Sequence, residues 1–130
     1  MLPDAERLVA DHLRADTAVA AAVGTRVSTE LPKQPTFPAV TLTRVGGVPS
    51  VPGYLDGPRL ELAAWGTTKG QAQSLARSVE AAMLTLVGAH ALGVVTLVIE
   101  SGEGLRWDPD DTFDPDQPRY QMVFDVYLHA

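Results

Sequence analysis

The chain contains no cysteine, which excludes disulfide bridges, thiolate metal sites and a thiol nucleophile. Basic residues are few, with 10 Lys and Arg against 16 Asp and Glu and a net charge of −6, so the basic footprint that grips nucleic acid is missing. No apolar run approaches the ~18 residues of a membrane helix, and no basic-then-apolar segment opens the chain. The sequence therefore predicts neither membrane insertion nor secretion.

What is present is an ordinary globular composition. Hydrophobic residues make up 45% and charged residues 20% of the 130 positions, which indicates a folded rather than a disordered chain. This length is enough for one domain with its own core and too short for two ordinary ones. We therefore expect a single domain over residues 1–130.

The negative charge is concentrated in one short segment, which holds Asp108, Asp110, Asp111, Asp114 and Asp116. This spacing is typical of loops that present oxygen to a hard cation, but an EF-hand needs a glycine at its sharp turn and a closing glutamate. A phenylalanine stands at the glycine position and no glutamate closes the segment. We therefore expect a solvated loop between two strands, whose charges discourage edge pairing. Weak adventitious cation binding is the alternative.

Two glycine-containing segments suggest a ligand loop, and both lack a required part. Residues 66–70 come between a predicted strand and a predicted helix, as a phosphate-binding loop does. In that motif a lysine follows the second glycine, whereas Lys69 precedes Gly70. We interpret this segment as a helix-capping turn, and the spaced glycines of residues 101–104 as a hairpin turn.

The histidines and tryptophans show no pattern of an active site. His12, His90 and His129 are scattered, with no spacing that supports a triad or a metal site, so we expect them at exposed or rim positions. Trp65 and Trp107 lie in or beside predicted strands, where core or interface packing is commoner than ligand stacking. The sequence predicts no catalytic, cofactor-binding or metal-binding residue, and it favours a structural or assembly protein over an enzyme.

Helical periodicity appears in residues 2–24 and 67–88. In the first region Asp4 can cap a helix, Asp16 or Thr17 can cap a second short one, and Gly24 can end it. In the second region Thr68 and Gln71 have the spacing of a capping box, and Gly88 is the expected stop. One face of this long helix is apolar, with Ala72, Leu75, Ala76, Val79, Ala82, Met83 and Leu86.

The remaining segments have strand character. Residues 25–31 predict a short strand, the three prolines of 32–38 a connector, 39–45 a strand and 46–57 a mobile loop. Residues 58–66 alternate, with Leu60, Leu62 and Ala64 on one face and Arg59, Glu61 and Trp65 on the other. The apolar run in 92–104 predicts a strand covered on both faces. Residues 104–110 and 118–130 form an expected hairpin pair joined by the acidic loop. The last strand has an apolar face of Tyr120, Met122, Phe124, Val126 and Leu128.

These elements predict an α+β fold, with a mainly antiparallel or mixed sheet, one long helix packed on it and an N-terminal helix. Three stretches resemble the tail terminator, or tail-completion, proteins of long-tailed double-stranded DNA phages and related prophages. They are "FPAVTL", "LELAAWG" running into "QAQSLARSVEAAM", and the closing "RYQMVFDVYLH". Together they cover most of the chain after Phe37. The acidic loop is unusual against this pattern.

The resemblance implies a virion protein that caps the head-proximal end of the tail tube, stops its polymerisation and offers a joining surface to the head. It implies a homo-oligomer, a hexameric ring, with the tail tube protein and the head–tail connector protein as partners. Genome DNA would pass through without specific binding, and no cofactor or membrane is implied. Assembly would take place in the host cytoplasm.

Two other readings remain open at this point. One is a head–tail connector, or neck, protein of the same virion, and the other is a small non-catalytic module that binds a ligand on an open sheet face. In the ring, the aspartates of the segment 108–116 would either repel DNA phosphates across a screening length of roughly 8–10 Å or meet a basic patch on a neighbouring ring.

Overall fold

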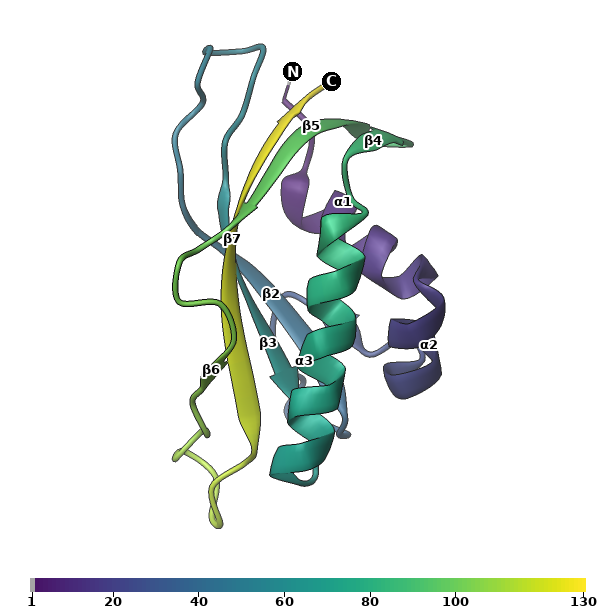
Figure 1. Cartoon of the computed structure of the whole chain (residues 1–130), viewed down its shortest axis with the longest axis vertical. Helices are drawn as coiled ribbons and strands as arrows, with labels where there is room; N and C mark the ends of the chain where they lie inside the picture. The colour runs from purple at the N-terminus through teal and green to yellow at the C-terminus, as the bar shows by residue number, and fades with distance from the viewer. Residues whose placement is uncertain (1) are drawn as a thin grey trace.

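In the computed structural model, which describes residues 2–130, the chain folds into one curled sheet with helices on one side (Figure 1). The helices of this part of the chain are α1 (Ala5–Ala15), α2 (Thr17–Val23) and α3 (Lys69–Leu84). The strands are β1 (Val27–Ser28), β2 (Ala39–Gly46), β3 (Arg59–Trp65), β4 (Gly88–His90), β5 (Gly93–Glu100), β6 (Arg106–Trp107) and β7 (Arg119–His129). The predicted α+β class is confirmed.

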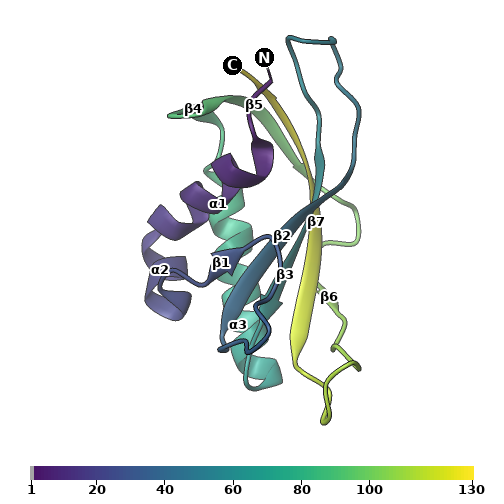
Figure 2. The ribbon, with the colours of Figure 1, turned by 180° about the vertical axis from the view of Figure 1, so that it is seen from behind.

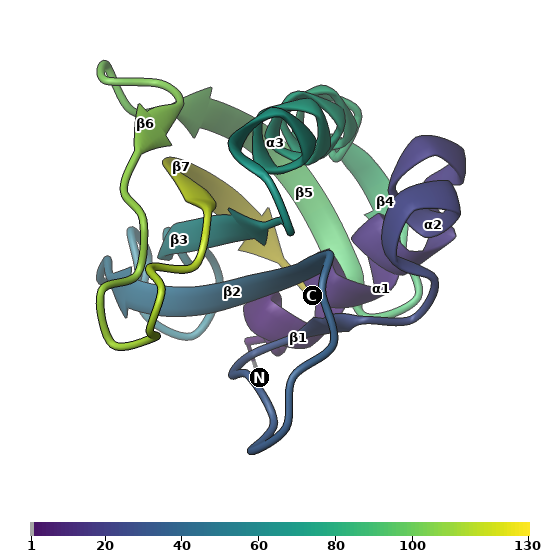
Figure 3. The same ribbon diagram turned by 90° about the horizontal axis from the view of Figure 1, so that it is seen from below.

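Strand β7 organises the sheet, whose order is β1-β2-β3-β7-β5-β4 with β6 paired to β7. On one side β7 pairs with β3, and on the other it pairs first with β6 and then with β5. All these pairings are antiparallel, and only β1 lies parallel to its neighbour β2. The sheet is therefore mixed but mainly antiparallel, and Figure 3 shows its curl from below.

The core lies between the sheet and the three helices. The apolar face of α3 is buried as its periodicity predicts, and Val79 has no exposed surface. The alternating side chains of β7 are buried on the same side, from Tyr120 to Leu128. Helix α1 adds Leu8, Val9 and Leu13. The predicted core faces of α3, β3 and β7 are confirmed.

Side-chain caps begin the helices as predicted. The carboxylates of Asp4 and Asp16 accept from backbone N–H groups in α1 and α2, and the Thr68 hydroxyl accepts from the N–H of Gln71 at 3.1 Å. The second half of the expected capping box differs, because the Gln71 side chain accepts from the N–H of Thr67 at 2.6 Å instead of from Thr68. Gly24 ends α2 with φ 60°.

Helix α3 ends one turn before Gly88, where the sequence predicted its end. Its last residue is Leu84, and Thr85 is the C-cap. The Thr85 hydroxyl donates to the carbonyl oxygen of Ala82 at 2.7 Å, and the His12 ring donates to the same oxygen at 2.9 Å. These two side chains add to the backbone N–H of Thr85, which donates to the same carbonyl oxygen at 3.1 Å, so the last turn of the helix is closed by three donors. Gly88, at φ 136°, instead begins β4.

The prediction that residues 92–104 are covered on both faces is wrong. In β5 the side chains of Leu97 and Ile99 are 48% and 46% exposed. They lie opposite Tyr127 and Asp125 of β7, on the sheet face that has no helix. A continuous apolar run is ambiguous in this respect, because it does not distinguish two covered faces from one covered face and one apolar contact surface.

Candidate functional site

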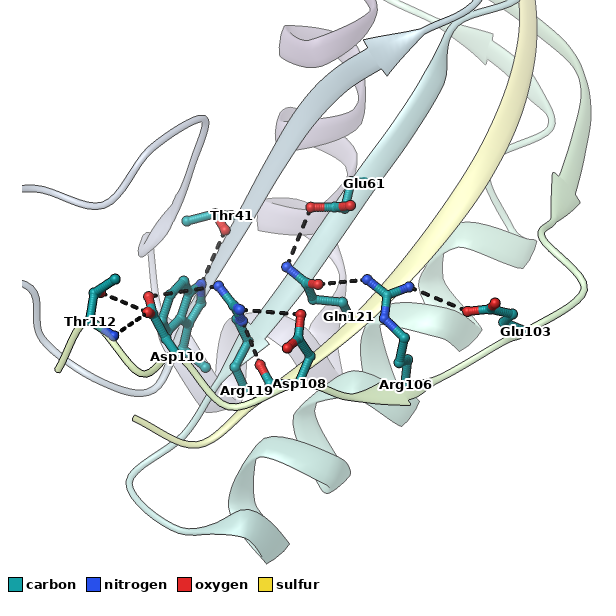
Figure 4. Close-up of polar contacts among 10 residues, drawn as sticks. Thr41, Glu61, Glu103, Arg106, Asp108, Asp110, Thr112, Arg119 and Gln121 are labelled. Atoms are coloured by element: carbon teal, nitrogen blue, oxygen red, sulfur yellow. Dashed lines mark hydrogen bonds and ion pairs between the residues drawn. The ribbon is translucent and has the colours of Figure 1, made fainter. Parts of the chain in front are cut away.

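The aspartates of the acidic loop divide into two groups. Asp108 and Asp110 lie 3.3 and 3.7 Å from guanidinium nitrogens of Arg119, as Figure 4 shows. Burial opposes the ionisation of Asp110, yet hydrogen bonds from Thr112 and the charge of Arg119 hold its pKa below the ordinary value. The other three aspartates of the loop are exposed. The loop therefore joins β6 to β7 as predicted, with its first two charges paired internally.

An aromatic cluster fixes the same loop to the sheet. Phe113 packs edge-on against Trp65 and Phe37, with ring centroids 6.1 and 5.9 Å away. Trp65 is 5% exposed, its indole N–H donates to Thr41 at 3.1 Å, and the Arg119 guanidinium stacks 4.9 Å above its ring. The residue at the glycine position of a calcium loop is thus an apolar anchor. The expected core or interface packing of Trp65 is confirmed as core packing.

A second polar network links β6, β7 and β3 through Arg106, Gln121 and Glu61. Arg106 donates to the side chain of Gln121 at 2.7 Å, and Gln121 donates to Glu61 at 3.3 Å (Figure 4). Glu103 lies 3.6 Å from Arg106 at the exposed end of this chain of contacts. Gln121 is 7% exposed and has partners for both of its amide atoms. The polar side chains here are used in structural contacts.

The segment 66–70 is a tight capping turn. A Cβ at Gly66 would lie 2.5 Å from the backbone nitrogen of Ala72, so no larger residue fits. Lys69 extends over the ring of Trp107, with its Nζ 4.8 Å from the centroid, in a cation–π contact. Trp107, 39% exposed, also packs against Tyr120. These contacts support the interpretation of 66–70 as a cap.

The histidines are half-buried, and two of them are neighbours. The rings of His12 and His90 meet edge-on, 5.4 Å apart, and the His90 ring donates to the carbonyl oxygen of Leu86 at 2.6 Å. His129 lies at the far end of β7. Within residues 2–130, no three potential metal-ligating side chains of the kind His, Cys, Asp or Glu come together. The pairing of His12 and His90 had no signal in the sequence, because 78 residues separate them.

Residues 46–57, predicted to be a mobile loop, form an arm that projects beyond the sheet (Figures 1 and 2). An isolated bridge pairs Val51 with Leu55 near its tip. At its base the carboxylate of Asp56, 3% exposed, accepts two hydrogen bonds from Arg44, at 2.6 and 2.9 Å. Gly47 has φ 88°, and a Cβ there would lie 2.1 Å from the carbonyl oxygen of Gly57. The base is thus tightly built.

The arm has exposed apolar side chains and little charge. Val48 and Tyr54 are 80% and 76% exposed, and residues 46–55 contain no charged side chain. A hollow of about 490 Å³ lies between the arm base and the helix-free face, where Arg59 and Asp125 form an ion pair at 3.0 Å. Two residues that line this hollow, Asp125 and Tyr127, lie opposite Ile99 and Leu97 of β5 in the sheet. The arm and this face form the candidate contact surface.

A half-buried acidic pair, Glu80 and Glu100, lies near the free end of β5. Burial, together with contact with Glu80, raises the pKa of Glu100 to about 7. One carboxylate oxygen of Glu100 is fully buried and has no hydrogen-bond partner of its own. Such a group costs stability when it ionises.

We therefore expect Glu100 to make the free energy of unfolding larger at acidic than at mildly basic pH. Since the folded-state pKa of Glu100 is raised, the contribution of Glu100 to stability is complete below about pH 4 and is lost as the pH rises through about 7. Glu100→Gln should raise the free energy of unfolding by about 1–2 kcal/mol at pH 8 and by almost nothing at pH 4. Urea titrations at both pH values test this, with the exposed Glu30→Gln as the control. An equal effect at the two pH values would contradict it.

The family model of the tail completion protein gp17 matches residues 7–127. The chain belongs to this tail completion family. The match begins within α1 and ends within β7, so it includes the arm and the acidic loop. The protein is therefore a structural tail or neck component of a phage-like virion.

A solved structure supports the same fold. A chain in the virion of a native gene transfer agent particle superposes with a TM-score of 0.69 at 22% sequence identity, covering 97% of this chain and 95% of that one. Among curated proteins, no sequence match was found. None of the helices in residues 2–130 is long and apolar enough to cross a membrane.

Proposed function

We propose that this tail completion protein forms a ring, of six subunits as its family resemblance implies, at the head-proximal end of the tail tube. There it stops polymerisation of the tube and presents a surface to the head–tail connector. The observation that carries this proposal is the uncharged, apolar arm beside a helix-free sheet face, in a chain matched to the family along almost its whole length. Exposed apolar surface of this kind marks a protein–protein contact.

The proposed activity is assembly without catalysis. The polar side chains that the sequence singled out are engaged in structural contacts: Arg119 with the acidic loop, His12 with the end of α3, and Lys69 with Trp107. We propose no cofactor and no metal. A heterologous contact repeated around an axis closes into a ring without any further component.

The acidic loop between β6 and β7 lies at the end of the molecule opposite the arm (Figure 1), and three of its aspartates are exposed. In a ring through which the genome passes, they would face either DNA or a partner. Near the channel they would repel phosphates at short range. Against the connector they would instead fix register with a basic patch. Both placements leave the arm free for contact between subunits.

We expect millimolar calcium to leave the melting temperature of the purified protein unchanged, because Asp108 and Asp110 are already paired with Arg119. A specific ligand at ~100-fold above its dissociation constant would add about 2.7 kcal/mol. Thermal melts with calcium and with EDTA measure this. A rise of several degrees in calcium alone would mean that the loop is a cation site.

Deletion of residues 48–55 tests the proposed function in the virus. The deletion should leave the fold intact, since it removes only arm residues outside the core cluster, but it should yield over-long tubes and unattached heads. Alanine at His12, His90 or His129, one at a time, should leave tail assembly intact. Electron micrographs of lysates give the tail-length distribution. Normal infectious virions from the deletion, or failed assembly from one histidine change, would contradict the proposal.

A further inference from the structure

Strand β5 has a free edge along its second half. One side of β5 pairs with β7, and on the other side β4 covers only Gly93 to Val95. From Thr96 to Glu100 no strand of the described chain lies on that other side. The backbone groups that point outward there have no strand partner, which makes this edge a template for another strand.

The features that discourage edge pairing, a bulge and a charged side chain, are present only at the two ends of this edge. Leu97 and Ile99 are half exposed. Residues 96–100 contain no lysine or proline, the residues that usually prevent edge pairing. A register shift near Thr96 and the carboxylate of Glu100 lie at its two ends. On the helix side, Leu84 is 62% exposed, one turn after the Glu80 that contacts Glu100. Leu97 and Ile99 therefore leave apolar surface exposed beside this edge.

The arm of the same chain has matching properties. Residues 48–50 make no backbone hydrogen bond within the described chain, and they carry the very exposed Val48. Pro49 has no N–H and Ser50 lies in a bend, so the unpaired donors of this short segment are the N–H groups of Val48 and Ser50. The arm and the edge therefore each offer unpaired backbone groups together with uncharged apolar side chains.

The arm does not reach the edge of its own subunit. Its base pairs with β7 through Asp56 and Leu128, and Pro58 accepts from Val126, on the side of β7 that faces β3. Strand β5 lies on the opposite side of β7. The Arg44–Asp56 ion pair and the close approach at Gly47 hold the base in this direction. The arm of the same subunit therefore does not pair with this edge.

We propose that the arm of one copy lies along the free edge of β5, Thr96–Glu100, of the next copy. Its apolar side chains would cover Leu97 and Ile99, and residues 48–50 would add a short strand, as in strand-addition recognition. The contact joins two different surfaces, so it propagates around an axis and closes as a ring. This inference rests on the proposed function for ring formation and specifies which surfaces meet.

Complementation between two variants tests the pairing. Deletion of residues 48–55 leaves the edge but no arm, whereas Leu97→Lys with Ile99→Lys leaves the arm but blocks the edge. Each variant alone should be a folded monomer by circular dichroism and sedimentation, since the changed positions are exposed. An equimolar mixture should form a dimer containing one of each chain. Rings formed by the lysine variant alone, or no dimer in the mixture, would overturn the pairing.

Disulfide trapping separates the pairing from the function. The chain has no cysteine, so Val48→Cys with Leu97→Cys or Ile99→Cys should give a covalent ladder up to the full ring on oxidation. The matched control, Val48→Cys with Gln73→Cys on the exposed face of α3, should give no ladder. Rings of wild-type protein without a trapped ladder would refute the pairing and leave the proposed function standing. A trapped ladder in a protein that never binds tail tubes would support the pairing and contradict the proposed function.

Discussion

Val79→Asp is expected to abolish soluble folding. Val79 has no exposed surface and lies in the middle of the buried face of α3, so the substituted carboxylate would have neither water nor a partner. A buried, unpaired charge of this kind costs more than about 4 kcal/mol, against a total stability of about 5–15 kcal/mol for an ordinary domain. Expression in the insoluble fraction and loss of the circular dichroism signal after refolding are the measurements.

Two matched variants make this prediction quantitative. Gln73→Asp introduces the same charge on the exposed face of α3 and should change the free energy of unfolding by less than about 0.5 kcal/mol. Val79→Ala removes only packing and should cost about 2 kcal/mol. Similar damage from Gln73→Asp and Val79→Asp would show that the helical phase is wrong.

The ion pair at the arm base gives the second large effect. Asp56→Asn keeps the shape of the side chain but leaves Arg44 without its bidentate partner, and we expect a loss of about 2 kcal/mol at pH 7. The loss is below that of a fully buried pair because the Arg44 side chain is 34% exposed and can be hydrated again. Urea titration of both proteins measures the difference.

The same pair predicts a pH dependence of opposite sign to that of Glu100. A hydrogen bond from Arg44 holds the pKa of Asp56 below its ordinary value, although burial opposes this. Its stabilising contribution is therefore present above about pH 4 and is lost as the pH falls through the lowered folded-state pKa. The difference in unfolding free energy between wild type and Asp56→Asn should shrink as the pH falls below the ordinary pKa of an aspartate, about 4. Asp111→Asn, in the exposed part of the acidic loop, should show no such difference at neutral or acidic pH.

Local patterns were enough to predict the helices and most strands. The caps at Asp4, Asp16 and Thr68 depend on residues within one turn, so their spacing is visible in the sequence. The end of α3 comes before Gly88 because Thr85 closes the last turn on the carbonyl of Ala82 and His12, about 70 positions earlier in the chain, donates to the same oxygen. Contacts over that separation leave no periodic signal.

The candidate contact surface was only half predictable. The composition of residues 46–57 indicated a segment outside the core. The base of the arm depends on the ion pair between Arg44 and Asp56, which the composition does not show. The exposure of Leu97 and Ile99 was hidden, because a strand with one contact face and one core face is apolar throughout. The anchoring of the acidic loop by Phe113 likewise depends on Trp65 and Phe37, which are distant in sequence.

Negative-stain imaging of the purified protein with isolated tail tubes tests the central claim most directly. The account predicts rings of uniform diameter in the protein alone and one ring at a single end of each tube, with no further tube growth after tube subunits are added. Protein lacking residues 48–55 should leave the tube ends bare under the same conditions. A protein that stays monomeric and leaves tube growth unchanged would contradict the claim.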